Sequence, residues 1–66
     1  MVTVTVNNEK RTTAASTLFE LLEILDYGDA VVATAVNGNF VPQTMRGETL
    51  ISDGDNVEIL APMQGG

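Results

Sequence analysis

The chain has 66 residues, a net charge of −6 and 44% hydrophobic residues, and it contains neither cysteine nor histidine. A domain of this size buries only about 60% of the surface of its unfolded chain, which argues against a large internal active-site cleft. Without cysteine and histidine there are no disulfides or thiolate clusters, and the most common general base and metal ligand are missing. The sequence therefore favours one small domain with no self-contained catalytic centre.

The net charge of the chain limits the classes of partner that it can bind. Three basic residues stand against nine acidic ones, which disfavours nucleic acid and anionic membranes because both require basic surface. A protein partner with a basic docking surface fits this charge, and so does acidity that only keeps the chain soluble. No apolar run approaches the ~20 residues that cross a bilayer, and no signal peptide is evident. We therefore expect a cytoplasmic protein.

The first residues predict a β-hairpin. Val2–Val6 alternates valine with threonine, which is typical of a half-buried strand with its valines on the core face. Residues 7–10 supply turn formers, since asparagine tolerates a left-handed backbone. Residues 11–14 are expected to return as a short second strand.

A helix is predicted next. Thr17 and Glu20 have the spacing of a capping box, in which the two side chains satisfy free amides of the first turn. Four leucines recur at i, i+3, i+4 and i+7 and form one apolar stripe that is expected to cover a sheet. Gly28 is expected to take the left-handed position that ends the helix. The leucines of the stripe are Leu18, Leu21, Leu22 and Leu25.

The second half predicts another hairpin and a closing strand. Residues 31–36 are apolar enough for a central strand, Asn37-Gly38 is a strong type I′ turn signal, and 39–41 pair back. Residues 43–48 are polar and irregular, with Met45 as their expected anchor. Residues 52–55 indicate a turn rather than a calcium site, because the remaining ligands are missing. Residues 57–60 form the last strand, with Leu60 pointing away from the core.

This order of elements predicts an α+β fold. A hairpin, a helix laid across it, a second hairpin and a closing strand give a mixed sheet of about five strands. The helical crossover permits the first and last strands to pair in parallel at the centre. We expect residues 1–60 to form this domain and residues 61–66 to form a flexible Gly-Gly tail.

The last residues carry the most distinctive chemistry. Gly65 and Gly66 have no Cβ, so this backbone fits a passage too narrow for other residues, and Gly66 carries the α-carboxylate. Extended, residues 61–66 would span roughly 20 Å at about 3.3–3.6 Å per residue. The alternative interpretation is an inert frayed terminus.

An independent enzyme is not supported by the sequence. There is no phosphate-binding loop of the type G-x-x-x-x-G-K-[ST], and no Ser-His-Asp or Cys-His set. The scattered carboxylates show no pairing for acid/base catalysis or for a metal site. A carrier fits better, because adenylation gives a terminal carboxylate a good leaving group. A partner would have to bind the ATP, together with magnesium to offset phosphate charge.

Four segments together resemble the thiamine-biosynthesis sulfur carrier (ThiS) family, which is related to the small subunit of molybdopterin synthase. They are STLFELL at 16–22, VNGNFVP at 36–42, DGDNVEI at 53–59 and QGG at 64–66. The resemblance implies a ubiquitin-like β-grasp fold. It also implies that Gly66 is adenylated by a ThiF-type enzyme and receives sulfur derived from a cysteine desulfurase. The resulting thiocarboxylate would supply thiazole synthase.

The resemblance assigns further roles. Gln64 and Gly65 are expected to thread into the partner. Docking is expected on the sheet face opposite the helix, with Phe40, Leu60 and Met63 as candidates, since an exposed apolar patch often marks an interface. The competing interpretation is that Phe40 and Leu60 pack in or against the thin core. Gln43 departs from the family, many members of which have a basic residue there.

Other functions remain open from the sequence. The same carrier chemistry would serve molybdopterin or another sulfur product. A protein modifier joined to lysines through Gly66 and a plain interaction module with an inert tail are further alternatives.

Overall fold

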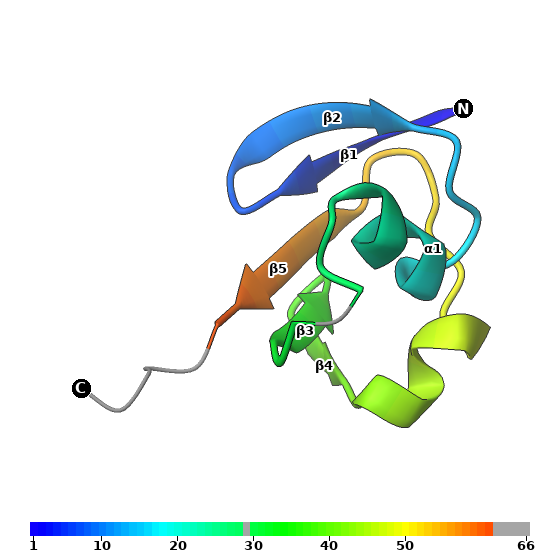
Figure 1. The fold of residues 1–66 in the computed structure, drawn as a ribbon. Coiled ribbons are helices and arrows are strands. Elements are labelled where there is room, and N and C mark those ends of the chain that lie inside the picture. The colour runs from blue at the N-terminus through cyan, green and yellow to red at the C-terminus, as the bar shows by residue number, and fades with distance from the viewer. Residues whose placement is uncertain (29, 62–66) are drawn as a thin grey trace.

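The structure is a computed structural model, and it describes residues 1–28 and 30–61 (Figure 1). Within these residues a five-stranded sheet carries one α-helix on one face. The elements in chain order are β1 (Val2–Val6), β2 (Glu9–Thr13), α1 (Leu18–Ile24), β3 (Ala33–Val36), β4 (Asn39–Val41), the 3-10 helix η1 (Gln43–Glu48) and β5 (Asn56–Leu60). Neither helix has the length and apolar character that would let it cross a bilayer.

The sheet has the strand order β2-β1-β5-β3-β4. β1 and β5 pair in parallel at its centre, and the other neighbouring strands are antiparallel. The predicted α+β architecture, with the first and last strands side by side, is therefore confirmed. Because β1 and β5 are parallel, the β1–β2 turn and the C-terminal end of β5 lie at the same end of the sheet (Figure 1).

Both hairpins turn through two residues. Asn7 and Asn8 have φ values of 49° and 71°, and Asn37 and Gly38 have values of 52° and 82°. These positive values at both central positions are those of a type I′ turn. The first turn was predicted to span residues 7–10, which is wrong. Asn8 adopts the left-handed backbone without glycine, so Val6 already pairs with Glu9 and β2 begins earlier than expected.

The helix begins as predicted. The Thr17 hydroxyl accepts the N–H of Glu20 at 3.2 Å, and the Glu20 carboxylate accepts the N–H of Ser16 at 2.8 Å. This reciprocal capping fixes the first turn and sets the leucine stripe against the sheet. Leu18, Leu21 and Leu22 are buried there, and Leu25 is partly buried.

The helix ends two residues before the predicted position. Asp26, not Gly28, has the left-handed backbone, with φ of 70°. Asp26 donates its N–H to the Glu23 carbonyl at 3.1 Å, and Tyr27 donates to the Leu22 carbonyl at 2.7 Å. These two bonds form a Schellman motif, which closes the helix as soon as the leucine stripe is complete.

Two further expectations need correction. The third strand begins at Ala33 rather than at residue 31, and Val31 is exposed. Residues 43–48 form η1 instead of an irregular loop. Its anchor is Arg46, which is 8% exposed, whereas Met45 is 45% exposed.

The core lies between α1 and one face of the sheet. Alternation in β1 and β5 buries Val4, Val6, Val57 and Ile59 on this face, as the period of a strand requires. The other face of the sheet carries no helix in the described chain. β5 is central to both the core and the sheet, and its last residue is followed by the C-terminal segment.

Candidate functional site

The end of β5 is where the chain leaves the sheet. On one side β3 pairs with β5 as far as Leu60, through the Ala33–Leu60 partnership. On the other side the backbone ladder with β1 ends earlier, where the Asn7 N–H donates to the Val57 carbonyl at 3.0 Å. The head of the β5 arrow lies at the periphery of the molecule (Figure 1). The central strand of the domain is thus the base of the C-terminal segment.

The four predicted site residues that follow this strand cannot be placed. Met63, Gln64, Gly65 and Gly66 lie outside the described residues, and Ala61 is the last residue described. What the structure does show is the geometry of their base. The flexible-tail prediction for residues 61–66 likewise stays a prediction.

Two asparagine side chains hold β5 near its two ends. Asn7 accepts the N–H of Ile59 at Oδ1 (2.8 Å) and donates Nδ2–H to the Ile59 carbonyl (3.0 Å). Asn37 accepts the N–H of Asn56 at Oδ1 (2.9 Å) and donates Nδ2–H to Asp55 Oδ1 (3.0 Å). Each asparagine is the first residue of a hairpin turn, and the two lie on opposite edges of β5.

The outer face of the sheet carries an apolar patch. Phe40 is 69% exposed and pairs with Ala35, and Leu60 is 67% exposed and pairs with Ala33. Their neighbours in sequence, such as Ile59 and Val41, are buried, so these four side chains share the face away from α1. We call Phe40, Ala35, Ala33 and Leu60 the outer-face patch. The alternative in which Phe40 and Leu60 pack into the core is wrong.

The outer-face patch continues to the base of the C-terminal segment. A shallow hollow of about 300 Å³ is lined by Val31, Val32, Ala33, Leu60 and Ala61. Glu58 is exposed and pairs with Ala35, so an acidic group borders the patch. A partner that covers this face would bury apolar surface next to the point where the chain leaves the sheet.

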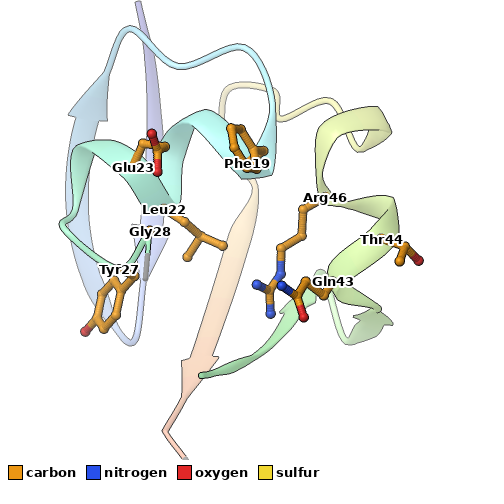
Figure 2. A pocket seen from close by; sticks show the side chains of 8 residues that line it. All are labelled: Phe19, Leu22, Glu23, Tyr27, Gly28, Gln43, Thr44 and Arg46. Atoms are coloured by element: carbon orange, nitrogen blue, oxygen red, sulfur yellow. The ribbon is translucent and has the colours of Figure 1, made fainter. Parts of the chain in front are cut away.

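A second hollow, of about 280 Å³, lies between α1 and η1 (Figure 2). Arg46 extends from η1 into it. The guanidinium donates from Nε to Thr34 Oγ1 at 3.1 Å and from Nη2 to the Val32 carbonyl at 2.6 Å. Thr34 in turn donates its hydroxyl to the Val41 carbonyl at 2.9 Å. The cation thereby ties η1 to β3 and β4, which is a structural role.

The acidic turn at 52–55 is also structural. Asp53 Oδ1 accepts the N–H of Thr3 at 2.7 Å, and Asp55 Oδ2 accepts the N–H of Ser52 at 2.8 Å. The turn is thereby attached to the start of β1. Across residues 1–28 and 30–61, no three acidic side chains gather in a way that would hold a metal ion.

Comparison with known proteins identifies the family. The model of the ThiS family matches residues 4–66, which is nearly the whole chain. The sulfur carrier protein ThiS of Escherichia coli (strain K12) is 36% identical over 53 residues, and the match covers 80% of each protein. The chain belongs to the ThiS family.

Solved structures of ThiS proteins share its fold. A crystal structure of the thiamine biosynthesis protein ThiS from Geobacter metallireducens matches with a TM-score of 0.82 at 33% identity, covering 98% of this chain and 100% of that one. An NMR solution structure of a thiamine biosynthesis protein from the same organism matches with a TM-score of 0.78 at 30% identity, covering 98% and 88%. The implied β-grasp fold is therefore confirmed.

Two residues of this ThiS-family chain were not singled out from its sequence. Asn7 was recognised as a turn former, but its hydrogen bonds to Ile59 connect positions 52 residues apart. Arginine is usually exposed, so nothing in the sequence indicated that Arg46 is buried. Asn7 lies beside β5 only because β1 and β5 are neighbours in the sheet. Its contact with β5 could therefore be predicted only from the parallel pairing of these strands, and not from the residues around Asn7.

Proposed function

We propose that this chain carries sulfur for thiazole formation in thiamine biosynthesis, as a thiocarboxylate at Gly66. The observation that supports this most strongly is the family match, which runs through residue 66 and so includes the Gly65-Gly66 end. The fold supports it as well, because the central strand β5 leads directly into that end. In this proposal the folded domain binds the partner proteins. Residues 61–66 form the C-terminal arm, which carries the reactive carboxylate.

The chemistry follows from the properties of a carboxylate. Its two oxygens share the negative charge, so the carbon is a poor electrophile. When one oxygen attacks the α-phosphate of ATP, pyrophosphate leaves and an acyl-adenylate forms. A hydrosulfide then attacks the carbonyl carbon, the C–O bond to AMP breaks, and a thiocarboxylate, AMP and a proton result.

Partner proteins supply everything that this chain lacks. A ThiF-type activating enzyme binds ATP and magnesium, sulfur derives from a cysteine desulfurase, and thiazole synthase receives the product. The chain itself holds no cofactor and performs no catalysis in this proposal. Gln64 and Gly65 thread into the partner, where glycine fits a narrow passage.

Docking uses the outer-face patch in this proposal. Phe40 and Leu60 supply exposed apolar area, and Met63 would extend it along the arm. Burying such area is favourable at roughly 25 cal/mol per Å². Glu58 beside the patch and the net charge of −6 favour a basic rim on the partner.

Intact-mass measurement tests the carrier chemistry. The chain is incubated with ATP, magnesium, a ThiF-type enzyme and sulfide. We expect a mass gain that corresponds to the replacement of one oxygen by sulfur, located in the C-terminal peptide. A variant without Gly66 is the control and should not gain mass. No gain in the wild type, with an enzyme that is active on its own carrier, would refute the proposal.

Genetic complementation tests the pathway. A thiamine auxotroph that lacks its own carrier should grow when this chain is expressed, and a strain without the small subunit of molybdopterin synthase should not. The reverse pattern would assign the carrier to molybdopterin. Conjugates of higher mass in a lysate that depend on Gly66 would instead indicate a protein modifier.

A further inference from the structure

The side chain of Asn7 continues a ladder that the backbone of β1 no longer forms. In a parallel pair that continued past Asn7, the next two bonds would run from the Ile59 N–H to the carbonyl of residue 7, and from the N–H of residue 9 to the Ile59 carbonyl. The chain has by then turned away into β2, where Glu9 pairs with Val6. The Asn7 amide makes both bonds instead, at 2.8 Å and 3.0 Å.

The Asn7 side chain can replace these backbone groups because of the backbone conformation of the turn. Asn7 has φ of 49°, which takes the main chain away from β5 and leaves the side chain on that side. An amide side chain carries a carbonyl and an N–H group, as a peptide unit does, so one residue replaces two backbone groups. Both edges of β5 are therefore hydrogen-bonded as far as Ile59, two residues before the last described residue, Ala61.

We propose that Asn7 is a positioning residue for the C-terminal arm, because its amide fixes the direction in which the chain leaves β5. This inference rests on the proposed function, in which a partner captures that arm. When β5 is hydrogen-bonded on both of its edges up to Ile59, the arm that follows samples fewer orientations from which it could not reach the partner. Less conformational entropy is then lost on capture, so the apparent affinity of the partner rises. The chemistry at Gly66 is unaffected once the arm is bound.

Asn37 provides a matched control within the same chain. It is also the first residue of a type I′ turn, with φ of 52°, and it also makes two side-chain hydrogen bonds beside β5. Its contacts lie at the start of β5, at the opposite end from the arm. The variants Asn7→Gly and Asn37→Gly keep a residue that accepts the left-handed backbone and remove the whole side chain with its amide. Both add the backbone freedom of glycine to a type I′ turn, so a difference between them reports the lost side-chain bonds.

Steady-state adenylation separates positioning from general stability. Pyrophosphate release by the activating enzyme is measured against carrier concentration for the wild type and both variants. We expect Asn7→Gly to raise KM about tenfold, with kcat within about twofold, which is the pattern of lost binding rather than lost chemistry. Asn37→Gly should leave KM within about twofold. Both variants should show similar losses in Tm.

Amide hydrogen exchange gives a readout that needs no enzyme. In Asn7→Gly the Ile59 amide should exchange faster while Asn56 keeps its protection, and in Asn37→Gly the reverse should hold. If Asn7→Gly does not fold, Asn7→Asp is measured in its place, since aspartate keeps an acceptor for the Ile59 N–H but loses the donor. A smaller KM rise, of about threefold, is then expected.

Three outcomes overturn the inference. They are an unchanged KM for Asn7→Gly (or for Asn7→Asp in its place), an equal rise in KM for Asn7→Gly and Asn37→Gly, and unchanged Ile59 exchange in Asn7→Gly. A wild-type chain that is not adenylated would refute the proposed function and this inference together. That result is seen before any substitution is compared, so the two kinds of failure are distinguishable.

Discussion

Arg46 shows how one polar residue organises a small core. It is 8% exposed, yet its guanidinium bonds the Thr34 hydroxyl and the Val32 carbonyl. Burying a charge is costly unless hydrogen bonds satisfy it, and these bonds lower that cost. They also connect η1 to the sheet, where Met45 contributes little because it is 45% exposed.

Truncating Arg46 is expected to destabilise the domain. Arg46→Ala removes two hydrogen bonds to a charged group and leaves the Thr34 hydroxyl and the Val32 carbonyl with fewer partners. We expect a loss of about 2 kcal/mol, which corresponds to a fall in Tm of roughly 10 °C for a chain of this size. Thermal unfolding followed by circular dichroism measures it.

Lys10→Ala is the control for Arg46→Ala, because Lys10 is an exposed cation on β2. It should change stability by less than about 0.5 kcal/mol. If Arg46→Ala proved as mild as Lys10→Ala, the anchoring role of Arg46 would be wrong.

Residue-scale roles were the hardest to predict because they depend on distant partners. The capping box of Thr17 and Glu20 was predicted correctly since both residues lie within one helical turn. The contacts of Arg46 and Asn7 cross between elements, and sequence spacing says nothing about them. Alternation along the strand placed Leu60 on the face away from the core, but whether Phe40 and Leu60 stay exposed or pack against the thin core depends on contacts between elements and was left open.

Elements were predicted better than their boundaries. Alternation, the leucine stripe and the Asn37-Gly38 turn each act locally, so strands, helix and hairpins were found in the right order. The end of the helix was missed because glycine is the usual left-handed residue there. Asp26 tolerates that backbone well enough for the helix to end two residues earlier.

A substitution at the end of the helix is expected to stabilise the domain. Asp26→Gly should raise the free energy of unfolding by up to about 0.5 kcal/mol. Aspartate lies at the low end of the left-handed cost of about 1–2 kcal/mol for an L-residue, and glycine gains about 0.4–1 kcal/mol of entropy in the unfolded chain, which offsets part of it. Guanidinium unfolding measures the change.

Gly28→Ala tests the rejected cap position. A Cβ at Gly28 would meet the carboxylate of Glu23, the far end of a flexible side chain that can move. We expect a change of less than about 0.5 kcal/mol. A loss of more than about 1 kcal/mol would contradict this structure, in which Gly28 does not take a left-handed backbone.

In the molecule as a whole, the residues that stabilise the fold and those proposed to bind a partner lie on opposite faces of the sheet. α1 covers one face of the sheet, and the outer-face patch lies on the other, beside the end of β5. The two faces could be predicted because the period of a strand divides its side chains between them. Which exposed apolar residues meet a partner does not follow from exposure alone, since Phe19 on α1 is 53% exposed as well.

Phe40 and Phe19 therefore form a matched pair for testing the docking face. Phe40→Ala should weaken binding to the activating enzyme about tenfold or more, as is usual for an aromatic residue central to an interface. Phe19→Ala removes a similar exposed ring from the helix face and should leave the Kd within about twofold. Isothermal titration calorimetry measures both, and both variants should unfold near the wild-type Tm. A larger effect from Phe19→Ala than from Phe40→Ala would place the partner on the helix face and contradict docking at the outer-face patch.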